Sequence, residues 1–298
     1  LHQHGAYAGI QLAHAGRKAS MQRPWFGNAA LDDADRARGD LPWRIVAPSA
    51  IPMDDGWLMP HELGEADLKE LRDYWRLATL RAVEAGFEFL ELHCAHGYLL
   101  HEFLSPLSNR RTDGYGGDRA ARMRYPLEIL DTVRAAWPDN LPLSVRVSSV
   151  DGIEGGIDLS DSVAFAKEAK ARGADLIDCT SGGLMGSATA ARIPRGYGFQ
   201  VPFAQEIRRE VGIATMAVGL ILHPQQAEDV LVQGSADLIA IGREALFDPN
   251  WPLHARMALG PQTGAAFDGW PEQYGWWLER RESGLRKLDG PALPFRRA

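Results

Sequence analysis

Two histidines three residues apart end a strand-like run, in the string His93-Cys94-Ala95-His96-Gly97-Tyr98. Imidazoles that converge on one point can bind a metal ion, act as an acid and base pair, or donate hydrogen bonds to a carbonyl oxygen. A zinc site would need a third protein ligand, and no spacing rule selects one among the candidates Glu91, Cys94, Asp178 and Cys179. In the alternative interpretation, His93 is a core histidine and His96 and Tyr98 are ordinary loop residues.

Polar side chains alternate with apolar ones in several strand-like runs. In Leu143-Ser144-Val145-Arg146-Val147 the apolar side chains would face the helices, which leaves Arg146 pointing inward. The same alternation turns Gln11, Glu91 and His93 inward, near the carboxyl ends of their strands, where barrel enzymes place their chemistry. The alternative is a structural network in which Glu91 pairs with Arg146 and Gln11 binds a backbone group.

Glycines end two further runs, in Ala217-Val218-Gly219 and Ile241-Gly242-Arg243. Backbone N–H groups at the tops of two consecutive barrel strands, together with a helix N-terminus, can hold a phosphate. The pattern therefore favours a phosphate site at Gly219, Gly242 and Arg243. In the alternative interpretation the glycines are turns and Arg243 is a surface charge.

Short apolar runs bounded mostly by Gly, Pro, Ser or Asn predict six strands. These are Ala8 to Ala13, Phe89 to His93, Leu143 to Val147, Leu176 to Thr180, Ala214 to Val218 and Leu238 to Ile241. Between them, helical patterns predict helices at Ala66 to Glu84, Ala120 to Trp137, Ser162 to Arg172, Phe203 to Glu210, Pro224 to Val232 and Pro252 to Leu259. Three helices are followed by a glycine suited to a left-handed cap and then by a strand, at Gly86, Gly173 and Gly234.

Repeated helix and strand units build either an open doubly wound sheet or a (β/α)8 barrel. The open sheet often carries G-x-G-x-x-G after its first strand, and no such string follows a strand here. We therefore predict an α/β fold, a (β/α)8 TIM barrel formed by residues 1–298 as a single domain, with a C-terminal tail from about residue 262. Because only six strands are visible, we expect the first two βα units to be missing from this chain. The stretch from His14 to Gly64 is expected to be a long loop over the barrel mouth.

Composition narrows the class of protein. The 298 residues are 45% hydrophobic and 24% charged, which is typical of a globular chain. A net charge of -7 argues against general affinity for nucleic acid or anionic membranes, and no apolar run approaches a membrane span. Two cysteines give no disulfide framework, which fits a reducing compartment such as the cytoplasm.

Taken together, these strings resemble the Old Yellow Enzyme family of flavin-dependent ene-reductases. The resemblance runs in matching order and spacing from about Tyr7 to residues 274–280. It is carried by the segments 9–18, 91–99, 104–117 and 145–148 and by the two glycine strings. The segment around Gln11 and the tail Trp276-Trp277-Leu278-Glu279-Arg280 resemble sequences of the bacterial branch of the family, which includes xenobiotic reductases and thermophilic-like ene-reductases.

The resemblance implies a non-covalent FMN at the barrel mouth, with NADPH or NADH as reductant. It implies that Gln11 binds the pyrimidine edge of the flavin, that Arg146 lies near N1 and O2, and that Gly219, Gly242 and Arg243 hold the phosphate. It further implies that His93 and His96 bind the carbonyl oxygen of an enone-type substrate and that Tyr98 delivers a proton. No metal is implied.

The resemblance also favours a homodimer or tetramer, since in that branch the aromatic tail reaches a neighbouring subunit. Two other hypotheses remain open from the residues alone. One is a metal-dependent TIM-barrel hydrolase that uses the His93 and His96 pair, and the other is an inactive fragment.

Overall fold

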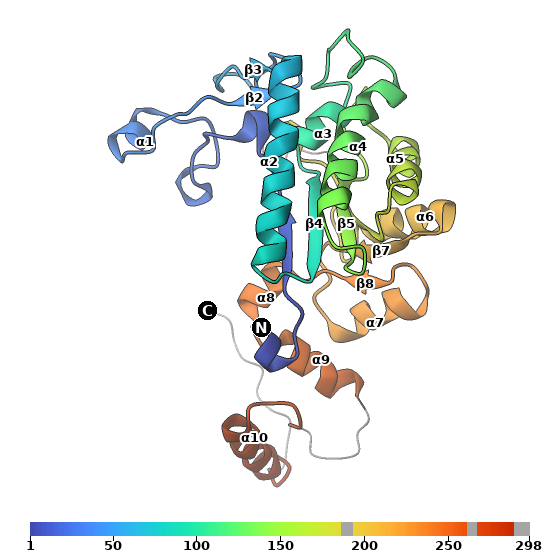
Figure 1. Cartoon of the computed structure of the whole chain (residues 1–298). Coiled ribbons are helices and arrows are strands. Elements are labelled where there is room, and N and C mark those ends of the chain that lie inside the picture. The colour runs from blue at the N-terminus through green and yellow to red at the C-terminus, as the bar shows by residue number, and fades with distance from the viewer. Residues whose placement is uncertain (186–192, 261–266, 289–298) are drawn as a thin grey trace. The chain divides into compact units, whose positions relative to one another are not determined.

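The computed structural model describes residues 1–185, 193–260 and 267–288 (Figure 1). The chain divides into two compact units. The first comprises Leu1–Leu220 and Val230–Ala240, and the second comprises Ile221–Asp229 and Ile241–Ala298. The predicted start of a tail at about residue 262 lies outside the described residues, and the single-domain assignment stays a prediction.

A six-stranded parallel sheet forms the centre of the first unit. Its strands follow one another in the order β1-β4-β5-β6-β7-β8, which is also their order along the chain. A doubly wound sheet would reverse its order at a switch point, whereas a barrel adds each strand beside the last. The strands are β1 (Gly9–Leu12), β4 (Phe89–Cys94), β5 (Leu143–Ser148), β6 (Leu176–Thr180), β7 (Ala214–Ala217) and β8 (Leu238–Ile239). All six predicted strands are confirmed, and the two further strands of a complete barrel are not among the described residues.

Helices connect these strands, and consecutive ones pack together: α2 on α4, α4 on α5 and α5 on α6 (Figure 1). The predicted helices are confirmed within a few residues. They are α2 (Glu65–Glu84), α4 (Arg119–Ala136), α5 (Leu159–Ala171), α6 (Val201–Val211), α7 (Pro224–Val232) and α9 (Trp251–Leu259). Gly86, Gly173 and Gly234 have φ of 78°, 86° and 69°, as expected of left-handed caps. The helices α3 (Leu99–Leu104), α8 (Arg243–Phe247) and α10 (Glu272–Leu285) were not predicted.

The core lies between the sheet and its covering helices. Leu90, Leu92, Leu143 and Val145 are fully buried there. These residues alternate with Glu91, His93, Ser144 and Arg146, so the alternation read from the sequence places the polar set on the opposite face.

The stretch 14–64, which was predicted to be one long loop, contains several short elements of secondary structure. It contains two 3-10 turns, Gly16–Lys18 and Pro24–Phe26, and the five-residue α-helix α1 (Asp33–Ala37). It also contains a parallel pair of two-residue strands, β2 (Val46–Ala47) and β3 (His61–Glu62). A reciprocal capping box between Asp32 and Asp35 begins α1, which explains why so short a helix forms. These short elements are held by local polar contacts, which produce no periodic pattern of hydrophobic residues in the sequence.

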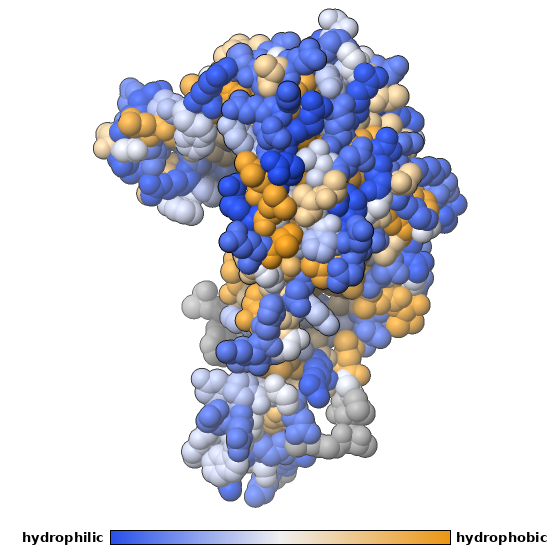
Figure 2. All heavy atoms as spheres, in the orientation of Figure 1, coloured by the Kyte–Doolittle hydropathy of each residue, from blue (hydrophilic) through white to orange (hydrophobic). Residues whose placement is uncertain are grey.

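Apolar surface is spread over the exposed side of α2, where Leu77 and Leu80 lie (Figure 2). In the second unit, α8, α9 and α10 are the main elements, and Trp251 Nε1 donates to the Leu222 carbonyl at 2.7 Å. No helix in the described part of the chain has both the length and the apolar character needed to cross a membrane.

Candidate active site

His93 is buried at the carboxyl end of β4. The Ala95 N–H donates to its Nδ1 at 3.1 Å, so Nδ1 must accept. Burial lowers the pKa of His93 to about 4, with further contributions from Arg146 and His101. The ring is therefore neutral near pH 7, and we assign its proton to Nε2.

Both the backbone and the ring of His96 make hydrogen bonds that hold this residue in place. It has a φ of 59°, its N–H donates to Ser148 Oγ at 2.9 Å, and its carbonyl accepts from Lys18 Nζ at 2.7 Å. Its Nδ1 lies 3.3 Å from His93 Nε2, and its Nε2 lies 2.6 Å from Thr180 Oγ1. Burial, followed by Arg146, lowers the pKa of His96 to about 2, so this ring is also neutral.

Arg146 lies beside His93 in the register of β4 and β5 and beside Asp178 in the register of β5 and β6. Its Nε is 3.0 Å from Asp178 Oδ2, without the alignment of a hydrogen bond. Burial raises the pKa of Asp178 to about 7, although Arg146 acts in the opposite direction. Thus the guanidinium is incompletely paired and a quarter exposed.

Gln11 and Glu91 form a separate contact. Gln11 Nε2 donates to Glu91 Oε1 at 2.6 Å, and Ser144 Oγ donates to Glu91 Oε2 at 3.0 Å. The alternative network, with Glu91 on Arg146 and Gln11 on a backbone group, is therefore wrong in both pairings. Register decides this, because Gln11 and Ser144 lie directly opposite Glu91, whereas Arg146 lies opposite His93.

Tyr98 precedes α3 and is half-buried against the first histidine. Its ring centroid lies 4.9 Å from that of His93, and Lys18 Nζ lies 5.9 Å from the Tyr98 ring centre. Burial lowers the pKa of Lys18 to about 8. The structure thus brings His93, His96, Tyr98 and Arg146 to one group of strand ends.

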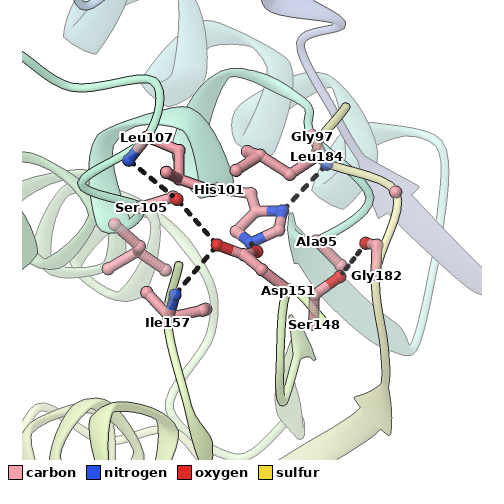
Figure 3. A network of polar contacts seen from close by, with 12 residues as sticks. Ala95, Gly97, His101, Ser105, Leu107, Ser148, Asp151, Ile157, Gly182 and Leu184 are labelled. Atoms are coloured by element: carbon pink, nitrogen blue, oxygen red, sulfur yellow. Dashed lines mark hydrogen bonds and ion pairs between the residues drawn. The ribbon is translucent and has the colours of Figure 1, made fainter. Parts of the chain in front are cut away.

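A buried network supports the turn that follows His96 (Figure 3). The Gly97 N–H donates to His101 Nδ1 at 2.8 Å, and His101 Nε2 lies 2.9 Å from Asp151 Oδ1, with both side chains fully buried. Asp151 Oδ2 accepts from Ser105 Oγ at 2.7 Å and from the Ile157 N–H at 2.9 Å. These bonds fix the loop that presents His96.

Some site residues were missed by the sequence analysis. Lys18, Thr180, His101 and Asp151 were given no role, and Asp178 was considered only as a zinc ligand. Alternation along β6 could have found two of them, because Asp178 and Thr180 occupy the face opposite to Ile177 and Cys179. The others act through contacts between distant segments, which leave no local pattern.

The predicted phosphate residues are divided between the two units. Gly219 belongs to the first unit and has a φ of 117°, with Gln200 closely packed on it. Gly242 and Arg243 belong to the second unit, where they begin α8. A joint phosphate site formed by these three residues stays a prediction.

Residues 1–260 match the model of the NADH:flavin oxidoreductase / NADH oxidase family. The chain belongs to this family. A NADPH dehydrogenase of Listeria innocua is 46% identical over 274 residues, which cover 92% of this chain and 72% of that protein. A NADPH dehydrogenase of Geobacillus thermodenitrificans is 44% identical over 276 residues, with the same two coverages. Among solved structures, the old yellow enzyme homologue from Zymomonas mobilis has a TM-score of 0.67 and 24% identity, covering 92% of this chain and 74% of that one.

The flavin oxidoreductase is thus an NAD(P)H-dependent enzyme with FMN as cofactor, and the resemblance to the Old Yellow Enzyme family is confirmed. Its residues fit the cofactor. Arg146 Nε and Asp178 Oδ1 are buried atoms without a hydrogen-bond partner in the described part of the chain. Such atoms in a native fold call for a ligand or water, and a flavin offers both acceptors and a donor.

The neutral histidines predict a pH effect on stability. In the unfolded chain a histidine takes up its proton near pH 6.5, whereas in the fold His93 resists protonation down to about pH 4 and His96 to about pH 2. The contribution of the two neutral histidines to the free energy of unfolding is therefore fully present above pH 6.5 and is lost as the pH falls. Between pH 6.5 and 4.5 we expect the double variant His93→Gln/His96→Gln to lose less free energy of unfolding than the parent protein, by about 1 kcal/mol per pH unit for each histidine. Urea unfolding at several pH values measures this difference, and parallel slopes for the two proteins would contradict it.

Proposed function

We propose that this flavin oxidoreductase reduces the activated C=C bond of α,β-unsaturated carbonyl compounds. The observation that carries the proposal is the pair of neutral imidazoles, whose facing nitrogens lie 3.3 Å apart beside Arg146. Uncharged donors can polarise a carbonyl without protonating it outright, which suits a substrate whose oxygen gains charge during the reaction.

His93, His96 and Tyr98 each have a defined role in this reaction. His93 and His96 bind the carbonyl oxygen and stabilise the negative charge that develops on it. The hydride for the β-carbon would be supplied by FMN when it is bound and has been reduced by NAD(P)H. Tyr98 delivers the proton to the α-carbon, so that one hydride and one proton together saturate the double bond.

The cofactor contacts complete the proposal. Gln11 and Arg146 would bind the flavin ring, and Gly219, Gly242 and Arg243 its phosphate. NADPH is the first reductant to test, because the NADPH dehydrogenases at 46% and 44% identity carry that name. The alternative metal-dependent hydrolase is less well supported, since no cluster of three or more His, Cys, Asp or Glu suited to a metal occurs among the described residues.

β1 and β8 each pair on one side only in the described part of the chain, and a closed barrel leaves no such edge. We infer an eight-stranded barrel in which two further strands lie between them. The exposed Trp276 and Trp277 of α10 support a homo-oligomer, which light scattering would test. We further propose that the enzyme is cytoplasmic, since its two cysteines give no disulfide framework.

An absorbance spectrum followed by anaerobic titration tests the function. We expect a yellow protein whose flavin is bleached by NADPH and regains its colour when 2-cyclohexenone is added. Colourless protein with stoichiometric zinc would favour the hydrolase, and an unreactive yellow protein would refute the enone substrate.

Replacement of Tyr98 tests the proton donor. We expect Tyr98→Phe to slow reoxidation of the reduced enzyme by 2-cyclohexenone by about 10²-fold or more, because a positioned acid contributes that much. Reduction by NADPH needs no such proton and should change far less. Stopped-flow measurement of both half-reactions provides the comparison, and equal slowing of the two would remove Tyr98 from the role.

A further inference from the structure

We propose that Thr180 is a positioning residue that keeps His96 Nε2 hydrogen-bonded whichever ring nitrogen carries the proton, and that its hydroxyl reverses its hydrogen bond when a carbonyl oxygen binds. The reversal rests on the proposed function, since it needs an oxygen held between the two histidines. The placement of the proton in the ligand-free protein rests on geometry alone.

A chain of hydrogen bonds with a fixed direction leads to Thr180. It begins at the Ala95 N–H, a backbone group that can only donate, and therefore leaves the His93 proton on Nε2. That N–H points at His96 Nδ1, 3.3 Å away, which must then accept. The proton of His96 is left on Nε2, where it is donated to Thr180 Oγ1 at 2.6 Å.

This arrangement conflicts with the binding of a carbonyl. An oxygen between the rings needs an N–H from His93 Nε2 and another from His96 Nδ1, yet Nδ1 holds a lone pair in the ligand-free state. A second proton on the ring would provide that N–H, but burial beside Arg146 holds the pKa of His96 at about 2. The remaining route is a change of tautomer, in which the proton on Nε2 is lost to water and one from water joins Nδ1.

The change of tautomer leaves a lone pair on His96 Nε2, in contact with a Thr180 side chain that is 1% exposed. A buried acceptor without a donor is costly. A hydroxyl can accept a proton in one state and donate its own in the other by rotating about its C–O bond, whereas a backbone amide or carbonyl cannot. Thr180 therefore satisfies His96 in both states.

The rest of the site holds the ring still while the protons move. Ser148 Oγ and Lys18 Nζ fix the backbone of His96 on both sides. Gly183 packs so closely that a Cβ there would lie 2.7 Å from His96 Cα. With the ring fixed, the hydroxyl of Thr180 is the part that is free to rotate.

The test uses the FMN-loaded, ¹⁵N-labelled protein and NMR spectra that distinguish the two histidine tautomers. Thr180→Val removes the hydroxyl at nearly constant volume, and Thr180→Ser keeps it. In the ligand-free parent and in Thr180→Ser we expect His96 protonated on Nε2. In Thr180→Val the tautomer should stay the same, because the Ala95 N–H still sets the direction of the chain, but the Nε2–H has lost its acceptor and should exchange with water about tenfold faster, the value of one lost hydrogen bond. Equal exchange rates in all three proteins would overturn the assignment of Thr180.

Addition of 2-cyclohexenone to the oxidised parent protein tests the reversal, because this ligand is not reduced there. We expect His96 to become protonated on Nδ1. If the enone shifts the flavin spectrum while His96 keeps its Nε2 proton, the reversal is wrong and the proposed function stands. If the enone disturbs neither histidine nor flavin, the proposed function fails, while the ligand-free comparison still decides the role of Thr180. This arm needs no variant, so a poorly folding Thr180→Val leaves the proposal testable.

Discussion

Replacing both His93 and His96 by Ala is expected to lower kcat/KM for 2-cyclohexenone by about 10³-fold or more. Removal of a single donor from a site of developing negative charge typically costs 10² to 10³ in rate, and here two donors are lost. The cost is large because both rings are neutral, with His93 buried and His96 partly buried, so water is a poor substitute for preorganised donors. Steady-state kinetics with NADPH and 2-cyclohexenone provide the measurement.

The same double variant should retain its FMN, since neither histidine is needed to hold the flavin ring in the proposed site. His4→Ala is the matched control, because His4 is exposed in the short turn His2–His4 of the first unit, ahead of β1, whereas the site lies at the carboxyl ends of the strands. A variant that loses the flavin but still binds phenol-type or enone ligands with unchanged affinity would show that the roles were assigned wrongly.

The second large effect is expected on the stability of the fold. It concerns the buried pair of His101 and Asp151, which supports the turn that follows His96. Asp151→Ala should lower the free energy of unfolding by about 3–5 kcal/mol, the usual cost of removing one partner of a buried pair. The substitution leaves His101 Nε2, the Ser105 hydroxyl and the Ile157 N–H without their acceptor. Although burial alone would raise it, the pKa of Asp151 is lowered by His101 and these donors, which shows that the fold favours the carboxylate.

For a chain of this size such a loss corresponds to a fall in Tm of about 10 °C, which calorimetry would detect. Glu206→Ala serves as control, because it removes a carboxylate from an exposed pair with Arg209 at 2.7 Å and should cost less than about 1 kcal/mol. Equal falls in Tm for Asp151→Ala and Glu206→Ala would mean that burial does not determine how much the pair of His101 and Asp151 stabilises the fold. Asp151→Asn, which keeps an acceptor for Ser105 or Ile157, should lie between the two.

Much of the scaffold could be predicted from local patterns. Period-2 alternation and short apolar runs located the six strands of the main sheet, and period-3.6 patterns, several with a closing glycine, located the long helices. The helix α3 was missed for a physical reason: it is six residues long and all of them are buried, the polar His101 and Glu102 included, so it has no solvent-exposed face and no amphipathic period. The elements in 14–64 were missed because they are one-turn helices and two-residue strands held by polar contacts.

Residue types and spacing by themselves determined the candidates for chemistry: His93, His96, Tyr98, Gln11 and Arg146. Only the tertiary structure decided their partners. Arg146 contacts Asp178 rather than Glu91, and His96 meets Thr180, 84 positions further along the chain. The reason is that a strand's own sequence fixes which face a side chain occupies, whereas the register between neighbouring strands, set by packing of the whole sheet, fixes what it touches.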